Sequence, residues 1–261
     1  MRASPPAWVA TRADTKLVLV GTIHVLPART QWRTERLDEA IASADTLIVD
    51  TQVSSTDTVT RAFAKRAFAA NLPPIRDRVS PESRPVLEAA LQRLKTPRAA
   101  FDRMKTWAAA FLLFGSRGGR CESGMSLKLE TEFGRAERTV IPLQTPDESL
   151  ADFDGLPESA QETLLAQALD PPPDDHYRAM ITSWAAGDLA GSAAAARSDM
   201  GSAPAIHAML ARMTARLSSA LLRAGTQPGT KLVVLGALHF DGPDSVLTQL
   251  QRNGYKVRRI Q

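Results

Sequence analysis

A ten-residue stretch occurs twice in this chain, as KLVLVGTIHV at 16–25 and as KLVVLGALHF at 231–240. Lysine, leucine, valine, glycine and histidine recur at matching places, and each difference exchanges one small or apolar residue for another. A short apolar run rich in β-branched residues is typical of a buried strand. Each run ends at a glycine, and a histidine follows three residues later. We therefore expect two strands that lie close together and bring His24 and His239 to one site.

The composition is that of a globular protein with a sizeable core. The chain has 261 residues, 44% of them hydrophobic, which suits one large domain or two small ones. We treat 1–261 as a single domain. The only cysteine, Cys121, has no internal disulfide partner and is expected to be a free thiol near a loop.

Charge and hydropathy exclude several classes of partner. The net charge is +4, but the basic residues are scattered and no zinc-finger, RNP or helix-turn-helix pattern is present, so no nucleic-acid partner is expected. No run approaches the roughly 18 apolar residues of a membrane span. The opening MRASPPAWVA lacks the apolar core of a signal peptide. As written, the chain is expected to be cytoplasmic, or extracytoplasmic if a leader was removed; the oligomeric state stays open.

Hydrophobic patterns and capping residues predict an α/β fold with a mixed, mainly parallel sheet flanked by helices. Strands are expected at 7–11, 16–20, 46–49, 139–143, 231–235 and 255–260, the first two as an antiparallel hairpin. Helices are expected at 34–44, 59–70, from about 80, at 98–114, 125–135, from 145, at 157–169, 175–186, 203–224 and 243–252, with a shorter one before 203.

The connections suggest how these elements are arranged. The strand at 46–49 should run parallel to the strand at 16–20, because a helix joins them. The region of roughly 55–135 is mostly helical and is expected to be an insertion between the second and third core strands. Within it, 115–124 is expected to be a flexible loop, and PPPDD at 171–175 is a further break.

Four of the expected strands lead to a polar side chain at the carboxyl end. Two lead to His24 and His239, and the others end at Asp50 and Gln144. In open α/β sheets, ligands bind beyond the carboxyl ends of the strands. Two imidazoles and a carboxylate suit zinc, manganese, cobalt or iron. The alternative is that each histidine simply bonds a loop, but two of only four histidines in matching G-x-x-H motifs favour a functional site.

The remaining candidates have a structural alternative beside the functional one. Asp50 is a metal ligand, an orienter of a histidine or a general base, or else it caps the following loop. Arg212 and Arg216 could bind a substrate carboxylate, with a solvated helix face as the alternative. The other two histidines, His176 and His207, fit structural or solvated positions better.

The same residues resemble a known family. The opening PAWVATRADTKLVLVGTIHVLPARTQWRTERLDEAIASADTLIVD is similar to the start of the TraB/GumN family, which includes the Tiki-type membrane-anchored metalloproteases. Residues 231–260, KLVVLGALHFDGPDSVLTQLQRNGYKVRRI, resemble its closing pattern, and TVIPLQTPDESL resembles its Leu-Glu-Thr segment. The resemblance spans nearly the whole chain. It is specific at both ends and loose through 51–135 and 155–225.

This resemblance implies a mixed α/β sheet flanked by helices, and it implies roles for individual residues. His24 and His239 match the two histidines implicated in divalent-metal-dependent peptide hydrolysis. Asp50 stands where the family usually has Glu, so the carboxylate is kept with a shorter reach. Gln144 stands where the family has Glu, and an amide cannot be a general base. The Arg-Asn pair common before the second motif is replaced here by APAIHAMLARM.

Three functions are therefore compared. The first is a metal-dependent hydrolase, peptidase-like and acting on a peptide or protein, with a divalent manganese, cobalt or zinc ion held by His24, His239 and Asp50, and with Gln144 positioning water or substrate. The second is a ligand- or partner-binding protein on the same fold, which Gln144 and the missing Arg-Asn pair favour. The third is an esterase-like hydrolase without metal, as in the distantly similar erythromycin esterases. The paired G-x-x-H motifs favour the first.

Overall fold

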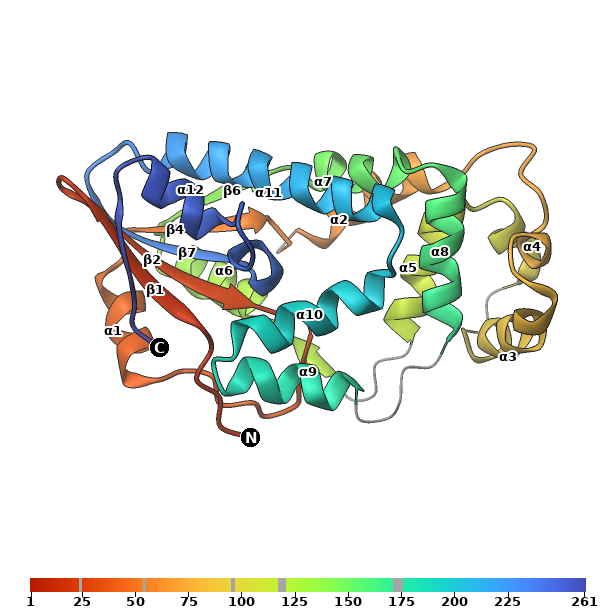
Figure 1. Cartoon of the computed structure of the whole chain (residues 1–261), viewed down its shortest axis with the longest axis horizontal. Helices are drawn as coiled ribbons and strands as arrows, with labels where there is room; N and C mark the ends of the chain where they lie inside the picture. The colour runs from red at the N-terminus through yellow and green to blue at the C-terminus, as the bar shows by residue number, and fades with distance from the viewer. Residues whose placement is uncertain (24, 54, 95–96, 117–120, 171–175) are drawn as a thin grey trace.

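A computed structural model describes residues 1–23, 25–53, 55–94, 97–116, 121–170 and 176–261 of the chain. His24 and the PPPDD segment at 171–175 lie outside the described residues. The described part has a β-sheet at one end of the molecule and a group of helices at the other (Figure 1).

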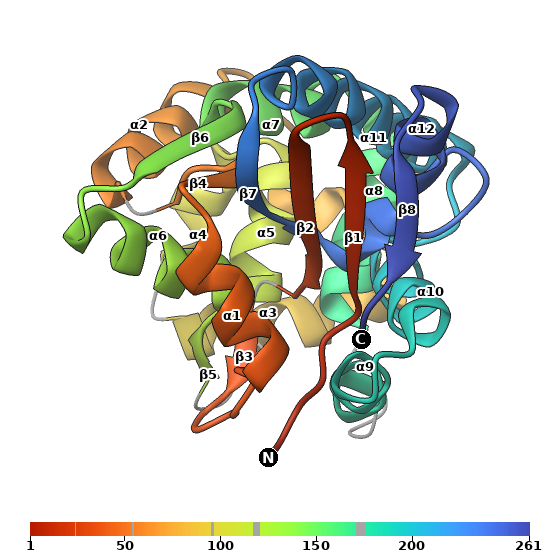
Figure 2. The same ribbon diagram turned by 90° about the vertical axis from the view of Figure 1, so that its left-hand side faces the viewer.

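The sheet has six strands in the described residues, in the order β6-β4-β7-β2-β1-β8, which can be followed across Figure 2 from β6 and β4 on the left to β8 on the right. Their bounds are β6 Thr139–Gln144, β4 Thr46–Thr51, β7 Gly229–Gly236, β2 Thr15–Thr22, β1 Ala7–Arg12 and β8 Lys256–Arg259. The first four run parallel, and β1 pairs antiparallel with both β2 and β8. The predicted mixed, mainly parallel sheet is confirmed. Pro142 lies in β6 at the edge of this sheet, where a missing backbone N–H is tolerated.

The two copies of the repeated stretch form neighbouring parallel strands, in a register that the sequence does not reveal. Leu17 lies opposite Lys231, and Thr22 lies opposite Gly236, so the strands are offset by one residue from the alignment of the two copies. Because successive side chains of a strand point to opposite faces, the offset places matching residues on opposite sides of the sheet. Leu17 packs in the apolar cluster on one face, and its counterpart Leu232 packs in the cluster on the other.

β7 also changes the expected arrangement of the first crossover. Helix α1 (Glu35–Ser43) connects β2 to β4 and begins where predicted, with the Thr34 hydroxyl accepting from the N–H of Leu37 over 3.3 Å. The two strands run in the same direction, as expected, but they are not neighbours, because β7 pairs with both of them and lies between. The chain's last parallel strand is thus inserted into its first crossover unit.

Helices cover both faces of the sheet and form a separate group beyond it. They are α2 Thr56–Ala67, α3 Arg84–Leu94, α4 Arg98–Asp102, α5 Thr106–Ser116, α6 Met125–Arg135, α7 Pro146–Asp154, α8 Glu158–Leu169, α9 His176–Ala185, α10 Leu189–Met200, α11 Pro204–Ala224 and α12 Val246–Arg252, with 3₁₀ turns η1 Ile75–Asp77, η2 Pro81–Ser83 and η3 Ala237–Phe240. Buried side chains of α1, α6 and α9 pack on one face of the sheet, and those of α11 and α12 pack on the other. We call α2, α3, α4, α5 and α8 the helical lobe, because they share one apolar cluster with the first half of α11. Figure 1 shows α11 running from this lobe to the sheet.

Two expectations within the helical region were wrong. The helix expected at 98–114 is two helices, α4 and α5, because the backbone between them is hydrogen-bonded to the segment after α2. The backbone N–H of Lys105 donates to the carbonyl of Ala67 over 2.7 Å, and the backbone N–H of Ala69 donates to the carbonyl of Arg103 over 3.1 Å. The flexible loop expected at 115–124 contains strand β5, Cys121–Ser123, which pairs antiparallel with β3, Val25–Pro27. Neither pairing is visible in a local sequence pattern.

An ion-pair cluster ties the helical lobe to the sheet. Arg66 in α2 donates from Nε and Nη2 to Asp147 in α7, over 2.8 and 2.7 Å. Lys65 Nζ lies 3.2 Å from the same carboxylate, and Lys105 Nζ lies 2.6 Å from Asp154 at the other end of α7. The Arg66 guanidinium, with a smaller contribution from Lys65, lowers the pKa of Asp147 to about 2. Because α2 follows β4 and α7 follows β6, these pairs hold two helices that begin beside the carboxyl ends of those strands.

Candidate functional site

Asp50 lies where the carboxyl ends of β4 and β7 meet. Its Oδ2 accepts a hydrogen bond from the backbone N–H of Gly236 over 3.3 Å, and its Oδ1 accepts one from the N–H of Thr51 over 2.8 Å. Each carboxylate oxygen has two lone pairs, so these single bonds leave acceptor capacity on both. The carboxylate is therefore held in place across two adjacent strands and can still bind a ligand.

His239 lies in the turn that follows β7. This turn is the 3₁₀ segment η3, and the residue is 7% exposed. Its Nδ1 lies 2.8 Å from the hydroxyl of Thr214 in α11. A Cβ built on Gly236 would lie 4.0 Å from His239 Nε2 and also 4.0 Å from Asp50 Oδ2. The nearest atom to that Cβ is His239 Cδ2, at 3.5 Å, so the Cδ2–Nε2 edge of the imidazole and the Asp50 carboxylate both border the space beside Gly236.

Contacts on two further sides fix the η3 turn. Phe240 stacks on Trp8 of β1 with the ring centroids 5.1 Å apart. Arg197 of α10 donates from Nη1 to Asp241 over 2.7 Å, directly after the turn. His239 is therefore carried by a segment that is anchored to the sheet, to α10 and to α11.

Gln144, at the end of β6, is buried and bonded at both ends of its amide. Its Nε2 donates to the Thr51 hydroxyl over 3.1 Å, and its Oε1 accepts from Arg216 Nη2 over 2.8 Å. Thr51 follows Asp50 directly, so the amide lies beside the Asp50 strand end. Arg216 also donates to both oxygens of Asp152, from Nη1 over 3.1 Å and from Nη2. The hydrogen bond with Asp152 is the main reason that the pKa of Arg216 is raised.

The structure places the other predicted residues as follows. Arg216 lies next to Gln144 with its guanidinium already bonded to Asp152, and Arg212, one turn earlier on α11, is exposed. Their role in substrate binding stays a prediction. His207 is exposed on α11, in agreement with the solvated position expected for it. His24 lies outside the described residues, so its approach to His239 also stays a prediction.

Sequence reasoning missed residues that surround these strand ends. Thr214 contacts His239, and Asp152 pairs with Arg216. Glu130 in α6 is 3% exposed, and its Oε1 and Oε2 lie 3.2 and 3.1 Å from the N–H of Val53, in the segment after β4. Each contact joins positions more than 24 residues apart, and nothing in the local pattern marks these side chains as different from solvated ones.

The donor set meets the requirements of a transition-metal site only in part. Imidazole nitrogen and carboxylate oxygen are ligands that zinc, manganese and cobalt accept. His239 and Asp50 supply one of each, but within the ranges that the structure describes, no group of three or more His, Cys, Asp or Glu side chains could hold a metal ion. A complete site would need a further ligand, and His24 is the candidate that the sequence offers.

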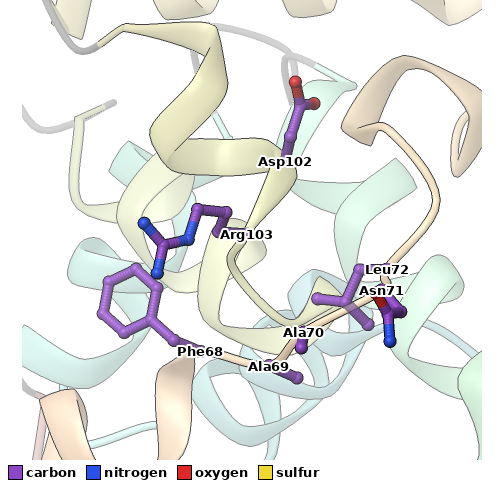
Figure 3. Close-up of a pocket in the computed structure, with 7 residues that line it drawn as sticks. All are labelled: Phe68, Ala69, Ala70, Asn71, Leu72, Asp102 and Arg103. Carbon is purple, nitrogen blue, oxygen red and sulfur yellow. The ribbon is translucent and has the colours of Figure 1, made fainter.

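The helical lobe has a hollow of about 510 Å³ that lies apart from the strand ends (Figure 3). It is lined by Phe68, Ala69, Ala70, Asn71, Leu72, Asp102 and Arg103. The Arg103 side chain extends toward the exposed ring of Phe68, and Asp102 accepts from the N–H of Ile75 over 2.8 Å. This hollow shares no residue with the Asp50–His239 cluster, and its one carboxylate is bonded to the backbone, so the candidate site is placed at the strand ends.

These features define an α/β protein whose imidazole, carboxylate and amide side chains gather at the carboxyl ends of a mainly parallel sheet. The chain belongs to the TraB/PrgY/gumN family, whose model matches residues 6–259. The resemblance inferred from the two ends of the sequence is thereby confirmed over nearly the whole chain. No curated protein and no solved structure matches it. In the described residues, no helix is both long and apolar enough to cross a membrane.

Proposed function

We propose that this chain is a divalent-metal-dependent hydrolase, peptidase-like in its chemistry, with its site at the carboxyl ends of β4, β6 and β7. The observation that carries the proposal is that Asp50 Oδ2 and His239 Nε2 border the same space, each 4.0 Å from a Cβ built on Gly236. Membership of the TraB/PrgY/gumN family supports it, because the two G-x-x-H motifs are the part of the resemblance that is best kept.

The proposal gives each residue a role. His239 and Asp50, together with His24, would hold the ion. A divalent ion held there would polarise a carbonyl group and lower the pKa of a bound water. Asp50 is oriented for this by the N–H groups of Gly236 and Thr51.

The amide of Gln144 would orient a polar group without exchanging a proton. Its carbonyl oxygen is bonded to Arg216, and its NH₂ group is bonded to Thr51, so the direction of the amide is set. A carboxamide has no proton to give or take near neutral pH, and the acid or base role therefore falls to Asp50 or to a bound water.

Metal uptake by the purified full chain tests the proposal. We expect manganese, cobalt or zinc to bind to the wild type, as measured by calorimetry and by elemental analysis after dialysis. A His24→Ala, His239→Ala double variant should lose this binding. His207→Ala is the matched control, because His207 is an exposed histidine on α11, and it should bind like the wild type. If the wild type takes up no more metal than the double variant, the proposal is wrong.

A binding protein on the same fold is the second candidate, and Gln144 favours it. The amide carries no charge, and each of its ends is bonded to a protein side chain. For this candidate we expect metal binding without cleavage of a broad peptide library. Cleavage gained by Gln144→Glu would then identify an enzyme that has lost its carboxylate.

The metal-independent esterase remains a third candidate, which a chelator separates from the first. Hydrolysis of a model ester that persists at full rate in excess chelator, and that is lost in Asp50→Asn, would favour it. Hydrolysis that the chelator abolishes and that manganese, cobalt or zinc restores would favour the metal-dependent enzyme.

A further inference from the structure

The Thr214 hydroxyl makes two hydrogen bonds, and its donor and acceptor roles in them decide which nitrogen of His239 carries the proton. Its Oγ1 lies 3.0 Å from the carbonyl oxygen of Leu210, one turn earlier in α11, and 2.8 Å from His239 Nδ1. A hydroxyl has a single proton to donate. A carbonyl oxygen can only accept, so that proton points to Leu210, and the oxygen of Thr214 accepts from the ring.

It follows that Nδ1 of His239 is the protonated nitrogen. In a neutral imidazole the other nitrogen then has the lone pair, and a metal ligand or a general base needs that lone pair. Here the other nitrogen is Nε2, which lies on the side of Gly236 and Asp50. The hydroxyl thus leaves the basic nitrogen on the edge of the ring that borders Gly236.

We propose that Thr214 is a positioning residue, which holds His239 in the tautomer that presents the Nε2 lone pair beside Asp50. The histidines that bind metals in proteins commonly donate their other N–H to an oxygen acceptor, which fixes both the tautomer and the ring orientation. The functional value of this tautomer rests on the proposed function, whereas the tautomer itself can be measured without a metal or a substrate.

The chain offers variants that separate this role from a structural one. Thr214→Val keeps the shape of the side chain and removes the oxygen, while Thr214→Ser keeps the oxygen. Ser218 is the matched control: it lies one turn further along α11, is buried, and its hydroxyl donates to the carbonyl of Thr214 over 2.7 Å, the same kind of bond within the helix. Ser218→Ala therefore removes an equivalent helix bond and leaves the His239 contact in place.

The first measurement is the tautomer of His239 in the metal-free full chain, by long-range ¹H–¹⁵N correlation spectroscopy near pH 8, with the signals assigned from their loss in His239→Ala. We expect Nδ1 to be protonated in the wild type, in Thr214→Ser and in Ser218→Ala, and the Nε2–H form to become populated in Thr214→Val. A wild-type ring protonated at Nε2 would overturn the inference, and so would a Thr214→Val ring that keeps the wild-type tautomer.

The second measurement is the affinity for manganese and zinc. Loss of an outer partner of a ligating histidine typically weakens metal binding by about 10–100-fold. We expect that loss in Thr214→Val, recovery in Thr214→Ser and no change in Ser218→Ala, with far-ultraviolet circular dichroism showing that all three are folded. If the wild type binds neither metal, the proposed function fails while the tautomer result stands. If both metals bind and Thr214→Val binds them as tightly as the wild type, the positioning role fails and the proposed function stands.

Discussion

The backbone N–H of Gly236 donates to Asp50 Oδ2 over 3.3 Å and so joins the carboxyl ends of β7 and β4, which are 186 positions apart in the chain. The bond brings the carboxylate that ends one strand next to the glycine that opens the second G-x-x-H motif. This hydrogen bond can form only because β7 is inserted between β2 and β4 in the sheet. The candidate site is therefore a product of strand order as much as of its side chains.

The two glycines of the repeated motif should respond differently to alanine. At Gly21, a Cβ would lie 3.2 Å from Pro6 Cγ and 3.3 Å from Ala237 Cα, so Gly21→Ala should destabilise the protein by about 1–3 kcal/mol through overpacking. At Gly236 the nearest atom would be 3.5 Å away and the backbone φ is −51°, so Gly236→Ala should be neutral or stabilising by about 0.5 kcal/mol. Urea unfolding measures both. The added methyl at Gly236 would lie 4.0 Å from both Asp50 Oδ2 and His239 Nε2, so metal uptake should weaken in the folded variant.

The Arg66–Asp147 pair should make stability depend on pH in acid. The pKa of Asp147 is about 2 in the folded protein, below its ordinary value near 4, because Arg66 and Lys65 favour the charged carboxylate. A lowered pKa means that the stabilisation is fully present above pH 4 and is lost as the pH falls toward 2. Between pH 5 and pH 2 the melting temperature should therefore fall less in Asp147→Asn than in the wild type. Equal slopes would show that this pair does not contribute, and added salt should reduce the difference because the groups are partly exposed.

Glu130 should stabilise the segment that follows β4. Its carboxylate is buried and accepts from the N–H of Val53, so Glu130→Ala leaves that donor without this partner and opens a cavity. We expect a loss of about 2–4 kcal/mol in the free energy of unfolding. Glu130→Gln keeps an acceptor and should lose less. Glu162→Ala, an exposed position on α8, is the control and should change stability by less than about 0.5 kcal/mol. A Glu130→Ala variant as stable as this control would contradict the prediction.

The amide of Gln144 should be replaceable by a carboxylate but not by an apolar group. Gln144→Leu removes one of the two acceptors bonded to Arg216 Nη2 and the amide donor bonded to the Thr51 hydroxyl, and it should destabilise the protein by about 1–3 kcal/mol. In Gln144→Glu, the carboxylate accepts from Arg216 and the Thr51 hydroxyl can turn to donate, so the change should stay within about 1 kcal/mol. Chemical unfolding compares the two. A larger loss in Gln144→Glu than in Gln144→Leu would mean that the hydrogen-bond directions are not as described.

Much of the fold could be predicted because its determinants are local. The capping box at Thr145 and Glu148 forms as the sequence indicates, with the Thr145 hydroxyl accepting from the N–H of Glu148 over 3.2 Å. The N-cap at Thr34 is also where it was expected. Helix α4 ends earlier than predicted because backbone groups from a distant segment form hydrogen bonds with the residues after it. A pattern of neighbouring residues carries no information on such long-range bonds.

Only part of the candidate site could be predicted from the sequence. Asp50 and Gln144 could be predicted because each lies at the carboxyl end of an apolar strand, and the carboxyl ends of parallel strands lie on the same side of a sheet. The residues that support His239 and Arg216 could not be predicted in this way. Thr214, which contacts His239, and Asp152, which pairs with Arg216, come from helices whose rotation and position are set by packing, and their neighbours in the chain carry no signal of these contacts.

The sequence by itself determined the six strands of the main sheet, two of the helix caps, the family and the carboxyl-terminal side of the sheet as the place where polar side chains collect, because these follow from hydrophobic period, glycine positions and hydrogen bonds between near neighbours. The tertiary structure alone decided the one-residue offset between the two copies of the repeated stretch, which turns Leu17 and Leu232 to opposite faces. It also decided that β7 lies beside β4 and that Thr214 meets His239. These relationships join residues far apart in the chain, and the packing of whole elements fixes them.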